Sequence, residues 1–205
     1  MLQRDALPSI IYAVDVESNG RTPPEIIELS VVAIQSGKIE LPPITWTIKP
    51  TQSIRRFASN IHGIEDVDLQ DSPALCSVQD EIITILRNYP ILAHNARIDY
   101  NLLTASLPHW EPKSVHDTLR LARIIVPSAP SHSLSSLVAY FNISETLQRH
   151  SLLRPHRADF DAGAAAFLFL ALLDEARKKG VTTERAMRMC EIDPQNHSPS
   201  QGRLL

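Results

Sequence analysis

The sequence predicts an α/β protein with a mixed five-stranded sheet, an antiparallel meander followed by parallel strands, and helices on both faces. Three apolar, β-branched segments, at about 9–16, 26–35 and 43–49, are separated by polar turns, which is typical of a strand meander. From residue 75 onward, apolar residues at helical spacing alternate with two short apolar runs. That alternation is typical of parallel strands joined by helices.

The meander follows from composition. The run Ile10–Val16 is apolar and β-branched, so it is expected to be a buried strand that ends at the polar residues and glycine of 18–20. Ser36-Gly37-Lys38 is expected to turn the second strand back toward the third. Residues 53–64 form a connection that ends in His62-Gly63-Ile64.

The parallel part continues from residue 75. Helices are expected at about 75–88, 98–107, 118–126, 134–141 and 158–178, with short strands at 91–93 and 114–116. Asp117 is expected to cap the helix that starts at 118, and the last long helix should end near Gly180. Its apolar stretch from Ala162 to Leu173 is 12 residues long. That is too short to cross a bilayer, so it predicts a core helix and no membrane association.

Two carboxylates lie near the end of the first strand. Side chains alternate along a strand, so Asp15 and Glu17 point to the same face. A cation would offset their repulsion, and hard oxygen ligands suit Mg²⁺ or Mn²⁺ better than zinc. A solvated strand end carrying two acids is the equally frequent alternative.

The segment HRADFDAG supplies a histidine and another acid. Pro155 favours an extended chain before the long helix, which places Asp161 in the first turns of that helix and His156 just before it. A histidine held apart from a metal can accept a proton from water. The alternative is a histidine near the helix start and an aspartate that complements the helix dipole.

The segment LAHNARIDYNLL has a similar arrangement. His94-Asn95-Ala96 is expected to form a turn after a short strand, and Asp99 opens the next helix. Asn95 could be an ordinary turn residue and Asp99 an ordinary N-cap. Each segment alone is weak evidence, whereas the three in this order are strong evidence for a site that cuts phosphodiesters.

The motifs resemble those of the DEDDh 3′→5′ exonucleases, the family of the proofreading subunit of bacterial DNA polymerase III. The resemblance covers about residues 8–177. The matching motifs are DVES at 15–18, HGI at 62–64, AHNARID at 93–99, HDTLRLAR at 116–123 and PHRADFDA at 155–162.

The resemblance implies an RNase H-like fold, two Mg²⁺ or Mn²⁺ ions, and release of nucleoside 5′-monophosphates. Asp15, Glu17 and Asp161 would hold the tighter ion, Asp15 and Asp99 the second, and His156 would be the general base. The residues expected to bind the terminal nucleotide are Ser18, Asn19, Gly20, His62, Asn95 and Ile98.

Two positions depart from the family pattern. Ile98 replaces the usual aromatic residue beside the terminal nucleotide, and Asn19 stands where a threonine is common. Both departures put strict proofreading in question. Arg154 and Arg157 flank the expected base, and their side chains are candidates for contact with backbone phosphates.

Size and charge agree with this interpretation. The chain has 205 residues, two cysteines without metal-type spacing and a net charge of −3. This charge argues against a protein that coats long nucleic acid, but not against one that engages a strand end. The cysteine usage and the absence of an apolar signal core predict a cytoplasmic protein. Residues 1–180 are expected to form the exonuclease domain, 181–192 a short helical extension and 193–205 a disordered tail.

Three alternatives stay open. One is an RNA-trimming exoribonuclease of the same superfamily rather than an enzyme that favours DNA. Another is an inactive RNase H-like domain that only binds partners, which the five retained site residues argue against. The last is an active accessory subunit that depends on a polymerase or another replication or repair protein. In each active case the expected substrate is a single-stranded 3′ end.

Overall fold

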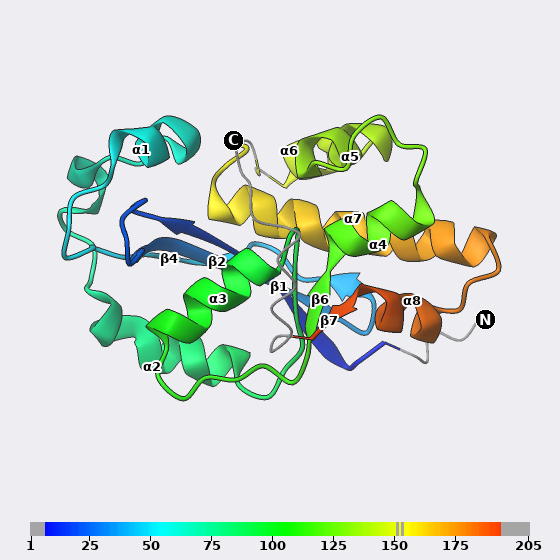
Figure 1. Cartoon of the computed structure of the whole chain (residues 1–205), viewed down its shortest axis with the longest axis horizontal. Coiled ribbons are helices and arrows are strands. Elements are labelled where there is room, and N and C mark those ends of the chain that lie inside the picture. The colour runs from blue at the N-terminus through cyan, green and yellow to red at the C-terminus, as the bar shows by residue number, and fades with distance from the viewer. Residues whose placement is uncertain (1–6, 151, 153, 194–205) are drawn as a thin grey trace.

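The computed structural model describes residues 7–150, 152 and 154–193 (Figure 1). Within them, one mixed sheet runs in the order β3-β2-β1-β5-β6-β7, with β4 also paired to β2. The strands are β1 Ile10–Ser18, β2 Ile26–Gln35, β3 Lys38–Ile39, β4 Ile44–Thr47, β5 Ile91–Ala93, β6 Val115–Asp117 and β7 Glu191–Ile192. Pairing is antiparallel from β1 to β2, parallel from β1 through β5 to β6, and antiparallel from β6 to β7. The expected meander followed by parallel strands is confirmed.

The expected number of five strands is wrong, because the described residues form seven. The third strand, expected at 43–49, is preceded by the separate two-residue strand β3. Pro42 and Pro43 lie between β3 and β4, and proline has no N–H to donate to a sheet ladder. The seventh strand is β7, which follows directly on the last helix and pairs with β6.

Helices cover both faces of the sheet, as expected (Figure 1). They are α1 Arg56–His62, α2 Leu75–Leu86, α3 Arg97–Ser106, α4 Thr118–Ile125, α5 Leu134–Tyr140, α6 Ser144–Arg149, α7 Ala158–Lys178 and α8 Thr183–Cys190. The expected helices are present to within a few residues. The sequence did not predict α1, α6 or the 3₁₀ turn at Asp66–Leu69.

The two faces of the sheet bury separate cores. Helices α4 to α8 pack on the face that presents Ile11 and Ala13 of β1, and α2 and α3 pack on the face that presents Val14. Helix α7 lies across β1 and β2, and its buried residues from Ala162 to Ala166 are all alanine or glycine. Small side chains let the backbone of this helix approach the sheet closely, which brings its first turn to β1.

The segment after α7 is part of the same core. Cys190 at the end of α8 is fully buried, and its Sγ lies 3.5 Å from Nδ1 of His116 on β6. The segment expected as a helical extension therefore contains α8 and also an edge strand of the sheet. The tail expected at 193–205 lies, except for Asp193, outside the described residues. Among the helices that the structure describes, none has the length and hydropathy needed to cross a membrane.

Candidate active site

The candidate site lies where β1 ends. Asp15 and Glu17 project from one face of β1, and Glu17 is the register partner of Glu28 on β2. The pairing shifts register between Glu17 and Ser18, at the point where the strand leaves the sheet. Such irregularities bend a strand and redirect its side chains.

Helix α7 supplies the third carboxylate. One carboxylate oxygen from each of Asp15, Glu17 and Asp161 lies within 4.8 Å of the others. The three acids are far apart in sequence, yet all are partly buried and converge on one point. The expected grouping of these residues is present in the structure.

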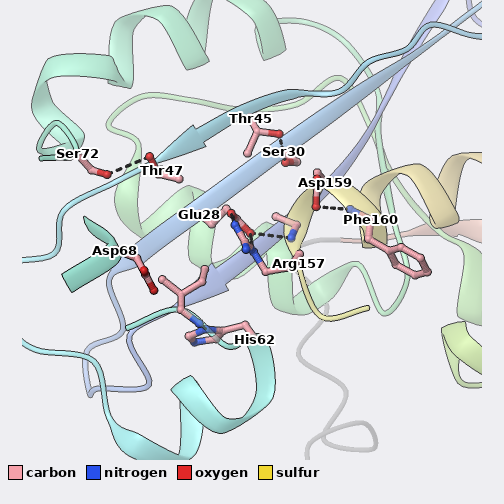
Figure 2. A network of polar contacts seen from close by, with 12 residues as sticks. Glu28, Ser30, Thr45, Thr47, His62, Asp68, Ser72, Arg157, Asp159 and Phe160 are labelled. Carbon is pink, nitrogen blue, oxygen red and sulfur yellow. Dashed lines mark hydrogen bonds and ion pairs between the residues drawn. The ribbon is translucent and has the colours of Figure 1, made fainter. Parts of the chain in front are cut away.

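A buried ion pair fixes the start of α7 (Figure 2). The side chain of Arg157 donates from Nε and from a terminal nitrogen to the carboxylate of Glu28, which is only 1% exposed. Glu28 also accepts a 2.9 Å hydrogen bond from the backbone N–H of Ala158, the first residue of the helix. Glu28 on β2 therefore holds the helix end that carries Asp161.

The fourth carboxylate, Asp99, is held in a different way. It lies in the first turn of α3, is 6% exposed, and its Oδ1 accepts a 3.1 Å hydrogen bond from the backbone N–H of Val16. Val16 lies between Asp15 and Glu17, so Asp99 is tied to the same stretch of β1. Burial raises the pKa of Asp99 to about 8, with further contributions from Asp117 and Asp161.

The other acids are perturbed in the same direction. Burial raises the pKa of Asp15 well above its ordinary value, and repulsion from Asp99, Asp161 and Glu17 adds to this effect. Burial and the charge of Asp161 raise the pKa of Glu17 to about 8, and burial raises that of Asp161 to about 6. Four crowded carboxylates ionise together only when cations balance them. Their hard oxygen donors fit Mg²⁺ or Mn²⁺.

His156 lies at the rim of this cluster. It is exposed, its backbone has a positive φ of 61°, and its N–H donates to Oδ2 of Asp161 over 3.2 Å. Its side chain is not among those that converge with Asp15, Glu17 and Asp161 in the described chain. The exposed imidazole lines the same open groove as Asp15 and Asp161, where it is accessible to water and substrate.

The residues expected to bind the nucleotide are distributed around β1. Ile98 is 46% exposed, and Asn95 lines the groove with its backbone at a positive φ of 69°. Ser18 is partly buried at the end of β1. Gly20 has a φ of 70°, and a Cβ there would lie 2.8 Å from Cζ of Phe57. No L side chain fits that position without displacing Phe57.

His62 is the last residue of α1. It is 4% exposed, and its Nδ1 accepts a hydrogen bond from the N–H of Ile64. No described residue forms a hydrogen bond of good geometry with its Nε2, although the nearby Ser18 backbone favours the protonated ring. Burial, the largest effect, lowers the pKa of His62.

Two side chains that the sequence placed beside the substrate have partners within the protein. Asn19 has no exposed surface, and its side chain is bonded to Glu25, Arg21 and the Gln52 carbonyl, so it organises the loop after β1. Arg157 was a candidate for phosphate contact, but Glu28 occupies its guanidinium. A charged residue inside the apolar strand 26–35 was a signal that could have identified Glu28 as a buried partner.

A mixed sheet with acids at the end of its central strand and on two adjoining helices defines the class of RNase H-like nucleases. The chain belongs to the exonuclease family RNase_T, which matches residues 12–169. The resemblance to DEDDh exonucleases is therefore confirmed at the level of the family.

Two curated relatives illustrate the similarity. The chain is 32% identical over 186 residues to the 3′-5′ exonuclease DinG of Bacillus subtilis, covering 85% of this chain and 19% of that protein. It is 34% identical over 175 residues to the PolC-type DNA polymerase III of Thermotoga petrophila, covering 82% of this chain and 12% of the polymerase. The chain thus spans less than a fifth of the length of these relatives.

Solved structures share the fold. Exonuclease X in complex with 5′ overhanging duplex DNA superposes with a TM-score of 0.60 at 24% identity, over 87% of this chain and 98% of that one. A 3′-exonuclease that recognises the histone mRNA stem-loop superposes with a TM-score of 0.63 at 18% identity, over 83% of this chain and 65% of that one. Solved structures with the same fold thus include a protein in complex with DNA and a protein that recognises RNA.

Proposed function

We propose that the protein is a metal-dependent 3′→5′ exonuclease that releases nucleoside 5′-monophosphates from single-stranded 3′ ends, with DNA favoured over RNA. The observation that carries this proposal is the convergence of Asp15, Glu17 and Asp161 at the end of β1, beside Asp99 and His156. Membership of the exonuclease family and similarity to a 3′-5′ exonuclease support the reaction and its direction.

The carboxylates would hold two Mg²⁺ or Mn²⁺ ions, with Asp15, Glu17 and Asp161 on one and Asp15 and Asp99 on the other. When bound, such ions lower the pKa of water and stabilise charge on the attacking and leaving oxygens. The ions would also make burial of four ionised acids favourable. They would offset the burial that raises the pKa values of Asp15, Glu17, Asp99 and Asp161, and the repulsion that adds to this effect at Asp15, Glu17 and Asp99.

His156 would act as the general base. Its position on the rim leaves the imidazole free to accept a proton from the attacking water, while its backbone stays bonded to Asp161. The terminal nucleotide would lie beside Ser18, Gly20, His62, Asn95 and Ile98. In this proposal the buried Asn19 supports the loop around Gly20.

The physiological setting is also proposed. Similarity to a segment of PolC-type DNA polymerase III supports work alongside a polymerase or another replication or repair protein. A cytoplasmic location agrees with the two unpaired cysteines, of which Cys190 is buried and Cys76 exposed.

Digestion of end-labelled strands tests the proposal. Single-stranded DNA, duplex DNA and RNA of matched sequence are incubated with Mg²⁺, with Mn²⁺ or with excess EDTA. We expect fastest loss of nucleotides from single-stranded DNA and no reaction in EDTA. Faster cleavage of RNA would support the exoribonuclease alternative, and full activity in EDTA would rule out the metal-dependent reaction.

A further inference from the structure

The groove that contains the acid cluster extends well beyond it. Its volume is about 590 Å³, and it runs from Asp15, Asp161 and His156 to a wall formed by α4 and the segment that leads into α5. That wall presents Arg123, Ser131 and Ser133, all of which are exposed. The groove therefore offers a surface for more of the substrate than its terminal nucleotide.

Most of the proposed pocket for the terminal nucleotide lies outside this groove. Asn95 lines the groove, whereas Gly20, His62 and Ile98 do not. These three residues belong to α1, α3 and the loop after β1, whereas the groove wall belongs to α4 and the start of α5. Figure 1 shows α1 and α3 toward the left of the molecule and α4 and α5 toward the right. If the terminal nucleotide is held near Ile98, the wall at α4 stays available to the retained strand, on the other side of the scissile bond.

Arg123 is the cation on this wall whose guanidinium N–H groups are available to a ligand. It makes no ion pair or hydrogen bond with any residue that the structure describes. The neighbouring His94 uses both ring nitrogens, bonding to Thr118 Oγ1 and to the His132 carbonyl at 2.9 Å each. His132 in turn bonds to the Val126 carbonyl through Nε2. These histidines are engaged within the protein, and the guanidinium of Arg123 is not.

The charge of the site favours such a cation. Two divalent ions would balance the four carboxylates, which leaves no excess positive charge for the phosphates that follow the scissile one. A guanidinium can bind a phosphate through two parallel hydrogen bonds. Serine hydroxyls are common additional donors to nucleic-acid backbones. Ser131 and Ser133 supply them beside Arg123, and Ser131 donates to Ser133 over 3.3 Å in the free protein.

We propose that Arg123, together with Ser131 and Ser133, binds a backbone phosphate of the retained strand, on the 5′ side of the scissile bond. This inference rests on the proposed exonuclease function and specifies the path of its substrate. It predicts that Arg123 strengthens the binding of an oligonucleotide, and that it has no effect on a substrate consisting of a terminal nucleotide alone.

Steady-state kinetics on two substrates test this proposal. The p-nitrophenyl ester of thymidine 5′-monophosphate presents the terminal nucleotide without a retained strand, whereas an oligothymidylate presents both. Arg123→Ala should raise KM for the oligothymidylate roughly 3- to 10-fold, leave its kcat nearly unchanged and leave the small ester unaffected. Arg123→Lys, which keeps the charge without the planar fork, should recover part of the loss. Arg185→Ala on α8, where another exposed arginine lies outside the groove, is the matched control.

Binding provides a second measurement that does not depend on turnover. Fluorescence anisotropy of labelled oligothymidylate, with Ca²⁺ in place of Mg²⁺, gives the affinity across a salt series. Loss of one phosphate contact should reduce the slope of log affinity against log salt by about 0.7 for a single strand. Equal KM values and equal slopes for wild type and Arg123→Ala would overturn the proposal, as would an equal effect in Arg185→Ala or an equal loss on the small ester. Failure of the wild type to cleave either substrate would instead contradict the proposed exonuclease function.

Discussion

Glu28 on β2 and Arg157 at the start of α7 form a buried ion pair that joins the sheet to the helix carrying Asp161. The hydrogen bonds to Glu28 raise the pKa of Arg157, so the guanidinium keeps its charge. Glu28 is also the strand partner of Glu17. One carboxylate therefore fixes the helix end, and its negative charge also contributes to the raised pKa of Glu17, an effect that Arg157 opposes.

Removal of Arg157 should destabilise the protein and disturb the metal site. Arg157→Met leaves Glu28 buried without its partner, which typically costs roughly 3 kcal/mol of unfolding free energy. Urea denaturation measures this loss, and calorimetric titration with Mn²⁺ should show weaker binding, because Asp161 is no longer held in place. The double variant with Glu28→Gln should recover part of the stability.

The exposed pair between Arg177 and Asp174 provides the control for that measurement. Arg177→Met should change the unfolding free energy by less than about 1 kcal/mol, because exposed pairs contribute little. If Arg157→Met is as mild as Arg177→Met and binds Mn²⁺ normally, the pair does not position the helix.

The metal-free protein should lose stability as the pH rises from about 4 to about 8. Glu17 and Asp99 have pKa values of about 8 in the folded state, above the values near 4 of unfolded carboxyls. The folded protein thus holds protons that the unfolded chain releases, so their stabilising effect is complete at low pH and is lost through pH 8. Thermal melting in EDTA measures the trend.

Two comparisons make that pH measurement specific. Glu17→Gln has no proton to release at this position, so it should flatten the dependence of the melting temperature on pH. Addition of Mg²⁺ should restore stability at pH 8 by binding the ionised acids. A metal-free melting temperature that rises steadily from pH 5 to pH 8 would show that the acids are not crowded in this way.

Loss of a single acid should remove activity without unfolding the protein. Asp161→Asn should lower turnover by roughly 10³-fold or more, because the site loses a ligand of the ion that would balance the charge on the scissile phosphate. The metal-free stability should be unchanged or higher, since repulsion with Asp15 and Glu17 is relieved. Asp159→Asn changes the same charge in the same helical turn and should retain most of the activity.

His156 should matter for proton transfer and not for metal binding. His156→Ala should lose about 10²- to 10⁴-fold in kcat while the Mn²⁺ affinity measured by calorimetry stays near that of the wild type. A variant that loses Mn²⁺ binding as completely as Asp161→Asn would identify His156 as a ligand.

The sequence predicted the elements with long apolar patterns and missed those that depend on tertiary contacts. Strand β2 and helix α7 were located correctly, because composition and turn residues mark their ends. In contrast, α6 has one buried residue, Leu147, and β7 has two residues, so neither has a pattern of its own.

The same limit applies to the site. Side-chain alternation and motif order were sufficient to group Asp15, Glu17 and Asp161. The sequence could not show which polar atoms the protein itself occupies, and for that reason Asn19 and Arg157 were assigned to the substrate. Asn19 bonds to Glu25 across a loop, and Arg157 bonds to Glu28 from a segment that is adjacent only in the folded chain.

The most direct test compares a linear single strand with a covalently closed circle of the same sequence, in Mg²⁺, with labelled nucleotides followed by chromatography. We expect that the linear strand yields nucleoside 5′-monophosphates from its 3′ end, that the circle resists, and that Asp161→Asn releases nothing from either. Cleavage of the circle as fast as the linear strand would show an endonuclease and contradict the proposed exonuclease function.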